Sequence, residues 1–280
     1  MSELQHLSYS SINAYLSCPR LWKFRYIEKL PTFGSPNLFF GSVWHNAIEE
    51  YISVSATGTD ALVDMYKKRW NFQLEREGEK MNWGGDNGEQ ETFDQGFRWI
   101  TGEIDVEATG IKGGASMAAF LDTIKPLARK SPGEKEKPLH VEDFVTLNVP
   151  GVSIPIIGYI DVITEDGIPT DFKTSSKSWS EKKALEEMQP LFYLAALSQA
   201  GVCVPGRQFR HIIFVKNKTP KVQSITTTHN MAKLLWLYRV IEDVWKAIEV
   251  EAFPVNPTGW QCSPRFCDYW GSCRGKFDGV

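Results

Sequence analysis

The chain has 280 residues, of which 42% are hydrophobic and 23% are charged, and this composition is typical of a globular protein with ample material for a core. Its formal net charge of −3 excludes a global basic field of the kind that attracts nucleic acid, although a local basic groove stays open. No apolar run approaches membrane-spanning length, and the polar N-terminus has no signal-peptide pattern, so we expect an intracellular, cytoplasmic protein with no membrane partner.

The N-terminal segment is predicted to be helical, basic and aromatic. Ser8 to Ser11 offer helix caps, and Pro19 starts a second helical turn. Arg20 and Lys23 flank Trp22, and such a pattern can follow a phosphate backbone and stack on bases. The alternative, which we favour, is an amphipathic helix with a solvated basic face.

A helix is predicted to start within Gly41 to Tyr51. His45 and Glu49 are four residues apart and share a face of it. A single His on a helix is usually structural, so His45 gains a role only if this helix packs beside the hairpin described next. Further helices are expected over 59–77, 91–107 and 116–130, with a charged linker over 131–138.

Residues 158–174 predict a β-hairpin whose short loop ends at Gly167, because glycine accepts the left-handed conformation that such loops need. This register places Asp161 opposite Asp171. Asp171 and Lys173 are two residues apart and therefore lie on one face of their strand. The hairpin thus gathers two carboxylates and one ammonium at one place.

Two carboxylates at one place require an explanation, because like charges directly opposite on a sheet are destabilising. Asp161 also lies in an apolar run over 154–163, where an unpaired carboxylate costs several kcal/mol or becomes neutral. A cation between them would resolve this, and Mg²⁺ or Mn²⁺ prefer oxygen ligands. The alternative is a solvent-facing hairpin in which Lys173 neutralises one Asp. Pro169 should lie at a strand start or edge, since it cannot donate to the ladder.

The strand before the hairpin adds a further carboxylate. Strands are predicted over 140–149 and 153–164, joined by a turn at Pro150 and Gly151. This turn would bring Glu142 near Asp161. Glu142 is therefore either a third carboxylate of the site or an exposed residue near a strand end.

After the hairpin, a capping box over 178–181 predicts a helix that Gly201 ends,. Pro190 should kink this helix. Gln189 and Tyr193 are four residues apart on one face, where such a pair is usually a polar rim. Strands over 207–216 and 221–228 and a long helix over 230–253 are expected to follow.

The C-terminal tail holds Cys262, Cys267 and Cys273 within a dozen residues. Three cysteines leave a tetrahedral site one ligand short, and Cys18 is the candidate fourth ligand, while Cys203 resembles an ordinary buried thiol. Four thiolates suit Zn²⁺ or an iron–sulfur cluster. Because paired Cys-x-x-Cys knuckles are absent, we favour [4Fe–4S]. Either group would tie the two ends of the chain together.

These features, taken in chain order, resemble the RecB-type branch of the PD-(D/E)xK nuclease superfamily. The order is His45 on a helix, Glu142 on a strand, GYID at 158–161, DFK at 171–173 and QxxxY at 189–193. The four cysteines resemble those of its iron–sulfur members, the CRISPR-associated RecB-like exonucleases and the AddB nuclease domain. One departure is visible: four residues separate the first two C-terminal cysteines, where the family often has two.

The resemblance implies an α/β fold with a restriction-endonuclease-like αβββαβ core, helical insertions and a C-terminal cysteine segment. It also implies a single nuclease domain over 1–280. The expected segments are an N-terminal helical part that contributes Cys18 (1–40), a helical insertion region (41–137), the catalytic sheet and helix (138–228), and a long helix with the iron–sulfur tail (229–280).

The resemblance further implies a role for each site residue. Asp161 and Asp171 would ligate Mg²⁺ or Mn²⁺, with the main-chain carbonyl of Phe172 and with His45, and Glu142 is a candidate additional ligand. Lys173 would orient or deprotonate the attacking water and stabilise the transition state. Gln189 and Tyr193 would position the DNA or the lysine.

The implied activity is that of a divalent-metal-dependent DNA nuclease, an exonuclease acting on single-stranded DNA or DNA ends and stapled by a [4Fe–4S] cluster. Two alternatives remain open. One is an accessory nuclease that works with protein partners in recombination or CRISPR adaptation. The other is a non-catalytic iron–sulfur DNA-binding module.

Overall fold

The computed structural model describes residues 4–32, 34–84, 88–107, 115–127, 140–217 and 220–277. The chain forms two compact units. The sheet unit comprises residues 34–145 and 159–230, and the cysteine unit comprises residues 1–33, 146–158 and 231–280. The expected division of a single domain into four successive segments stays a prediction, and the linker expected over 131–138 lies outside the described residues.

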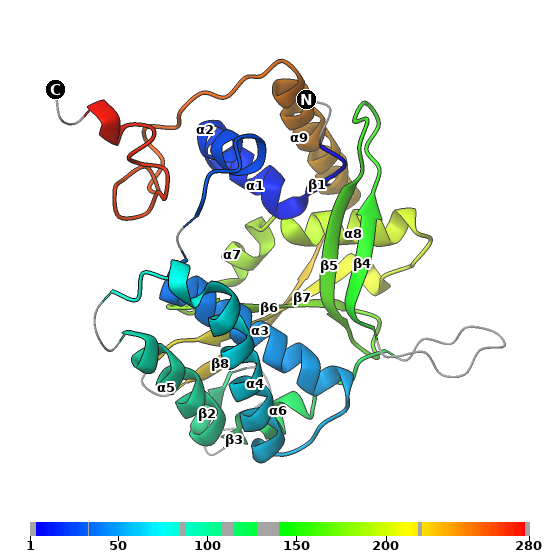
Figure 1. Ribbon diagram of the computed structural model, residues 1–280. Coiled ribbons are helices and arrows are strands. Elements are labelled where there is room, and N and C mark those ends of the chain that lie inside the picture. The colour runs from blue at the N-terminus through cyan, green and yellow to red at the C-terminus, as the bar shows by residue number, and fades with distance from the viewer. Residues whose placement is uncertain are drawn as a thin grey trace. The chain divides into compact units, whose positions relative to one another are not determined.

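A mixed β-sheet organises the sheet unit (Figure 1). Neighbouring strands pair in the order β5, β6, β7, β8, β2, β3, and β4 pairs with β5. The β6–β7 and β2–β8 pairs are parallel, whereas β5–β6 and β7–β8 are antiparallel. The bounds are β2 (Glu103–Val106), β3 (Ala115–Ser116), β4 (Val141–Leu147), β5 (Ile156–Ile163), β6 (Pro169–Ser175), β7 (Gln208–Val215) and β8 (Lys221–Thr228).

The predicted hairpin is confirmed as β5 and β6. Gly167 has φ of 76° in the connecting loop, the region that glycine adopts without strain. Val162 lies opposite Thr170, which is the expected register. Pro169 is the first residue of β6, a position where its missing N–H breaks no ladder hydrogen bond.

Beyond Thr170 the two hairpin strands part. Val162–Thr170 and Ile163–Pro169 are the pairs recorded between β5 and β6 in the described residues. From Asp171 to Ser175, β6 continues in parallel register with β7. The edge of β6 that faces β5 is therefore open along this stretch, and side chains or a ligand can reach its main-chain groups.

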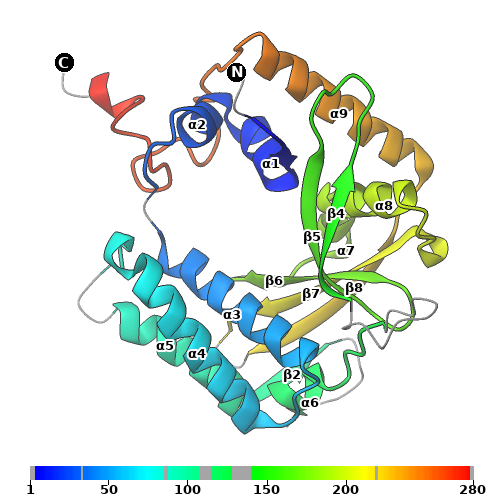
Figure 2. The same cartoon turned by 45° about the vertical axis from the view of Figure 1, so that its right-hand side comes forward.

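One face of the sheet is covered by helices that lie side by side (Figures 1 and 2). Trp44, Trp99 and Phe214 form the centre of this layer, with the two Trp rings 4.9 Å apart and the Trp44 and Phe214 rings 5.5 Å apart. These contacts fix the first helix of the layer against β6 and β7. The helices are α3 (Pro36–Ser53), α4 (Thr59–Glu77), α5 (Gly88–Thr101) and α6 (Met117–Leu121).

Two of the predicted helices in this region are wrong in extent. The helix expected over 91–107 ends at Thr101, and residues 103–106 alternate between exposed and buried as strand β2, because they pair with β8. The helix expected over 116–130 is only α6. Pro126 instead bridges to Thr164, and a proline there would break a helix.

On the opposite face, the single kinked helix expected after residue 178 is also wrong, because two helices form. Ser180, and not Ser178, caps α7 (Glu181–Glu186) by accepting a hydrogen bond from the Lys183 N–H at 3.2 Å. Pro190 lies in the first turn of a separate helix, α8 (Gln189–Gln199), where its missing N–H costs nothing. The Tyr193 ring stacks on Phe209 at 5.8 Å and holds α8 against β7. With α3, β4, β5, β6, α8 and β7 in chain order, the predicted αβββαβ core and its helical insertion are confirmed.

The cysteine unit joins the two ends of the chain. Strand β1 (Leu7–Ser8) pairs in parallel with the start of β5. The Trp22 ring stacks on Phe253 at 5.7 Å, and the Arg20 Nε donates to the Phe253 carbonyl at 2.9 Å. The helices are α1 (Tyr9–Ser17), α2 (Pro19–Trp22), a π-helical turn over Lys23–Ile27 and α9 (Met231–Glu249).

This packing changes the interpretation of the basic, aromatic N-terminal segment. Trp22 has no exposed surface, so in this structure its ring cannot stack on a base. Lys23 pairs with Glu28 at 3.2 Å, and Arg20 is engaged as described. The structure therefore favours the amphipathic helix over a surface that binds a nucleic-acid strand.

None of the helices in the described part of the chain has the length and apolarity that crossing a membrane requires.

Candidate active site

His45 lies on α3 between two carboxylates. Its Nε2 is 2.7 Å from Asp161 Oδ2, and its Nδ1 is 3.1 Å from Glu49 Oε1. Burial lowers the pKa of His45, but Asp161 and Glu49 outweigh that effect and hold this pKa well above its usual value. Helix α3 thus packs beside the hairpin, and this packing is the condition under which we expected His45 to have a role.

Asp161 lies at the point where β5 and β6 part. Its Oδ2 accepts a hydrogen bond from the Phe172 N–H at 2.6 Å and so replaces the main-chain acceptor that a continued ladder would supply. The N–H and C=O of one strand residue point to the same edge. The Phe172 carbonyl therefore faces the same gap between the strands as the Asp161 carboxylate.

Asp171 is almost fully buried, with 2% of its surface exposed. Its Oδ2 lies 2.5 Å from Lys173 Nζ, and its Oδ1 accepts from Gln189 Nε2 at 2.9 Å. Burial raises the pKa of Asp171 to about 6; the Lys173 ammonium opposes this shift, and the Asp161 charge adds to it. The structure thus brings both carboxylates and the lysine together, as the hairpin register implies.

A chain of hydrogen bonds from α8 holds Asp171. Gln189 Nε2 also donates to the Tyr193 hydroxyl at 3.1 Å, and this hydroxyl donates to the Tyr159 carbonyl at 2.5 Å. The two α8 side chains therefore connect the Asp171 carboxylate to the main chain of β5. Both side chains thus belong to the candidate site, while the expectation that they position the DNA or Lys173 stays a prediction.

Glu49 is the residue to which sequence reasoning gave no ligand role. It is only 8% exposed, and burial raises its pKa, with His45 opposing and with Asp161 and Glu142 adding to the shift. The signal that could have identified Glu49 is its spacing of four residues from His45, which we interpreted only as a shared helix face. Because the charge of Glu142 contributes to the raised pKa of Glu49, Glu142 lies near this end of the site. Glu142 itself is exposed, and its φ of 54° is left-handed, so it fits the alternative of an exposed strand residue better than that of a buried ligand.

The donor set fits a divalent cation. One ligand atom from each of His45, Glu49 and Asp161 can be chosen so that all three lie within 4.8 Å of one another. Neighbouring ligands of an octahedral ion with bonds of about 2.1 Å lie about 3 Å apart, close to the 2.7 Å between His45 Nε2 and Asp161 Oδ2. Carboxylate oxygens and a neutral imidazole are donors that Mg²⁺ and especially Mn²⁺ accept.

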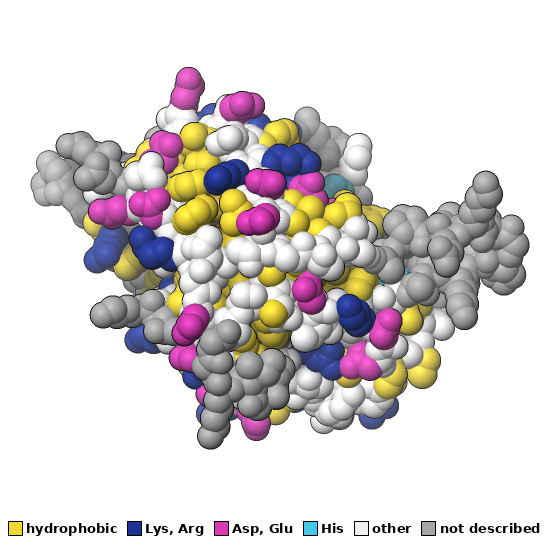
Figure 3. All heavy atoms as spheres, turned by 90° about the horizontal axis from the view of Figure 1, so that it is seen from below, with side chains coloured by type: hydrophobic (Ala, Val, Ile, Leu, Met, Phe, Trp, Pro, Cys, Tyr) yellow, Lys and Arg dark blue, Asp and Glu magenta, His cyan; other side chains and the backbone are white. Residues whose placement is uncertain are grey.

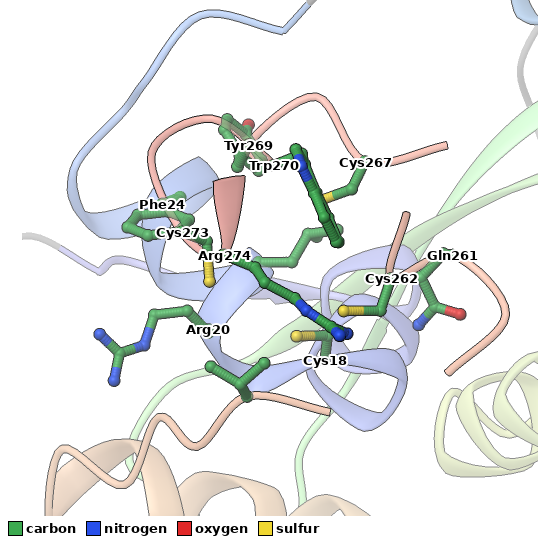
Figure 4. A pocket seen from close by; sticks show the side chains of 12 residues that line it. Cys18, Arg20, Phe24, Gln261, Cys262, Cys267, Tyr269, Trp270, Cys273 and Arg274 are labelled. Carbon is green, nitrogen blue, oxygen red and sulfur yellow. The ribbon is translucent and has the colours of Figure 1, made fainter. Parts of the chain in front are cut away.

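The four predicted cysteine ligands surround one hollow in the cysteine unit (Figure 4). All are free thiols. Burial raises the pKa of Cys267, and the charges of Cys18, Cys262 and Cys273 add to this shift because the four groups lie close together. A set of four convergent thiols fits either Zn²⁺ or an iron–sulfur cluster.

Two side-chain amides of the cysteine tail hold it next to Cys18. Asn256 Nδ2 and Gln261 Nε2 both donate to the Ser17 carbonyl, at 2.9 and 3.0 Å. The expectation of a buried Cys203 is wrong, because this thiol is exposed. It follows Gly201, whose left-handed φ of 78° turns the chain outward after α8.

Comparisons with known proteins agree with this arrangement. A search of curated proteins finds no match. Among solved structures, the chain resembles a crystal structure from Eubacterium rectale described as a "Putative exonuclease", with a TM-score of 0.52 at 10% sequence identity, covering 96% of this chain and 88% of that one. At this identity the likeness concerns the fold alone. The model of the PD-(D/E)XK nuclease superfamily matches residues 6–274, nearly the whole length, and the chain therefore belongs to the PD-(D/E)XK nuclease superfamily.

Proposed function

We propose that the protein is a divalent-metal-dependent DNA exonuclease that acts on single-stranded ends. Membership of a nuclease superfamily gives the reaction class. The observation that supports the proposal most is the convergence of His45, Asp161, Asp171 and Lys173 at the open edge of β6. A module that only bound DNA would have no use for two buried carboxylates next to a lysine.

The residues would divide the work as follows. His45 and Asp161 would hold Mg²⁺ or Mn²⁺ together with the Phe172 carbonyl and Asp171, and the bound ion would lower the pKa of water and neutralise phosphate charge. Glu49 accepts the Nδ1 proton of His45, which leaves the Nε2 lone pair free to ligate. Glu49 is thus a positioning residue in this proposal.

Lys173 would act on the phosphate and the attacking water. Its ammonium is held by Asp171 at 2.5 Å, and the Asp171 and Asp161 charges raise its pKa although burial lowers it. A lysine that stays protonated can donate to a phosphate oxygen or orient a water. Gln189 and Tyr193 keep the Asp171–Lys173 pair in place.

The test is digestion of end-labelled single strands with Mn²⁺ by the wild type, Asp171→Asn and Lys173→Gln. Glu165→Gln is the matched control, because Glu165 is exposed in the hairpin loop. We expect cleavage by the wild type and the control and its loss in both site variants. Equal cleavage by all four proteins would overturn the assignment, and degradation of a circular strand would show an endonuclease instead of an exonuclease.

We further propose that Cys18, Cys262, Cys267 and Cys273 hold a [4Fe–4S] cluster. The purified protein should be brown and contain iron and sulfide. Cys267→Ser should lose the visible absorbance, and Cys203→Ser should keep it because that thiol is exposed outside the set. A colourless wild type that contains zinc would identify the alternative occupant.

A further inference from the structure

A cleft of about 340 Å³ borders the candidate active site. His45 and Lys173 line it, so it opens directly onto the place where a phosphodiester would react. Trp44, Phe172 and Phe214 also line it, and they belong to the buried core. These rings are only 1–3% exposed, so they back the cleft from beneath, and the ionisable side chains that a ligand there would meet are His45 and Lys173.

Helix α3 forms one wall of the cleft with two neighbouring rows of side chains. Residues four apart lie above one another on a helix face. Small residues stand in the middle of each row, and at Gly41 the helix lies close to β6, since a Cβ there would be only 3.2 Å from Thr174 Oγ1. The rows are Asn37, Gly41, His45 and Leu38, Ser42, Asn46.

A lysine with no carboxylate partner in the described part of the chain lies beside this wall. Lys216 Nζ donates to Asn37 Oδ1 at 2.8 Å and lies 4.5 Å above the Phe40 ring. Burial lowers the pKa of Lys216 to about 8, with no contribution from a nearby carboxylate. A half-buried ammonium whose neighbours are an amide and a ring is short of negative charge, and a phosphate oxygen would supply it.

Leu38 is exposed along the same wall. It lies one turn before Ser42 on α3 and is 73% exposed. A large apolar side chain that projects into solvent beside the cleft offers an apolar contact for a nucleobase or sugar. Asn37 ties this turn of the helix to Lys216, so an apolar contact and a cation lie at neighbouring positions.

We propose that this cleft is a subsite for the nucleotide next to the scissile phosphate, with Lys216 on the adjoining phosphate and Leu38 against the base. This inference rests on the proposed nuclease function. A polymeric substrate whose phosphate reaches Lys173 continues beyond the reacting phosphate. Along α3 it would meet Leu38, which lines the cleft, and Lys216, which lies beside the cleft at Asn37. By contrast, acidic and basic side chains are interspersed on the face shown in Figure 3, and that face offers no comparable basic track.

The test measures kcat and KM for a labelled single strand with Mn²⁺ over a range of salt concentrations. Lys216→Gln should raise KM about tenfold, because a charge-assisted contact is worth about 1.5 kcal/mol or more. It should also reduce the slope of log KM against log salt by about 0.7, as expected for one lost contact to a single-strand phosphate. The value of kcat should change much less, because the subsite binds and does not react.

Two further variants probe the cleft itself. Leu38→Asp introduces a negative charge at an exposed position where folding is not at risk, and it should raise KM by a similar factor. Ser42→Trp should fill part of the cleft that Ser42 lines and raise KM further. The controls are Lys182→Gln, whose side chain is 83% exposed on α7, and Ser53→Trp, at an exposed position of α3. Thermal melting of each variant separates a blocked cleft from an unfolded one.

The outcomes are distinct. A KM and salt slope for Lys216→Gln and Leu38→Asp equal to those of the controls, in an active enzyme, would overturn the subsite and leave the nuclease function intact. A wild type that cleaves no DNA with Mn²⁺ would overturn both. An increase in KM confined to the cleft variants, with a smaller salt slope in Lys216→Gln alone, would support the subsite.

Discussion

The two candidate metal-binding regions of this protein are built in opposite ways. In the sheet unit, Asp161, Asp171 and Lys173 come from one hairpin, and the register set by the pairs next to its loop brings them together where the strands part. In the cysteine unit, Cys18 and the three C-terminal cysteines are more than 240 residues apart in sequence, and their meeting depends on packing between the two chain ends. The candidate catalytic set is therefore specified largely by local sequence, whereas the cysteine set depends on contacts between distant segments.

The largest effect should come from Asp161, the one carboxylate that contacts both His45 and the Phe172 N–H. Asp161→Asn keeps an oxygen that can accept from Phe172 and removes the charge. We expect cleavage to fall by about a thousandfold, since a metal ligand is worth several kcal/mol, with a melting temperature within a few degrees of the wild type. Activity within tenfold of the wild type would mean that the hairpin does not carry the chemistry.

Removal of the group bound by the cysteines should lower the stability of the protein. Extraction of the bound group with a chelator and a reductant should lower the free energy of unfolding by several kcal/mol, because binding to a folded site is coupled to folding. Thermal melting measures this change. Removal of Mn²⁺ alone with EDTA should abolish cleavage but leave the visible absorbance. If both treatments had the same effect on absorbance and melting, the two regions would not be distinct sites.

Glu49 tests whether the catalytic set extends beyond the hairpin. Glu49→Gln keeps a side chain that can accept from His45 Nδ1 but removes the charge. Losing such an outer partner of a ligating His typically weakens metal affinity by about 10- to 100-fold. The Mn²⁺ concentration at half-maximal cleavage should rise by this factor, with a smaller change at saturating Mn²⁺. Glu50→Gln is the control, since Glu50 on the same helix pairs with Lys68 and Arg69 instead.

His211 should affect stability instead of cleavage: it is fully buried on β7 opposite Asp171, and its two ring nitrogens have no hydrogen-bond partner among the described residues. Burial, with the Lys173 and His229 charges, lowers the pKa of His211 to about 3. The folded-state pKa lies below the ordinary value of 6.5, so the neutral ring favours folding above about pH 6.5, and this stability is lost as the pH falls toward 3. Denaturant unfolding should show a loss of up to about 1.4 kcal/mol per pH unit in that window, reduced in His211→Phe and unchanged in His6→Gln, at an exposed position. Identical pH profiles for all three proteins would show that the ring is hydrated and does not behave as a buried base.

The part of the fold that local signals specify was predictable from the sequence. The loop ending at Gly167 and the strand alternation fixed the hairpin register, and the four-residue spacing placed Gln189 and Tyr193 on one face. Strand β2 was mistaken for the end of a helix because its partner, β8, lies more than 100 residues later in the chain. Trp22 appeared available to stack on a base because the ring that covers it, Phe253, comes from the other end of the chain.

The candidate site shows the same division. Spacing and charge predicted the hairpin residues, and the resemblance to RecB-type nucleases gave His45 its expected ligand role. The cysteine set was predicted from the number of thiols and the helical context of Cys18. Glu49 was passed over because a carboxylate on a helix surface and one under a sheet edge look alike in sequence. Burial, which only the packing of α3 on β6 decides, separates the two cases.

The two amide side chains that meet at the Ser17 carbonyl have a consequence for how the cysteine site is loaded. Asn256 and Gln261 each donate a side-chain amide hydrogen to that oxygen, and Ser17 immediately precedes Cys18. If the thiols bind iron or zinc as proposed, these contacts would hold the tail near Cys18 in addition to the metal, and part of the entropy cost of ordering the tail would be met by them. An emptied protein should accordingly retain a docked tail that can be refilled, instead of releasing a free end.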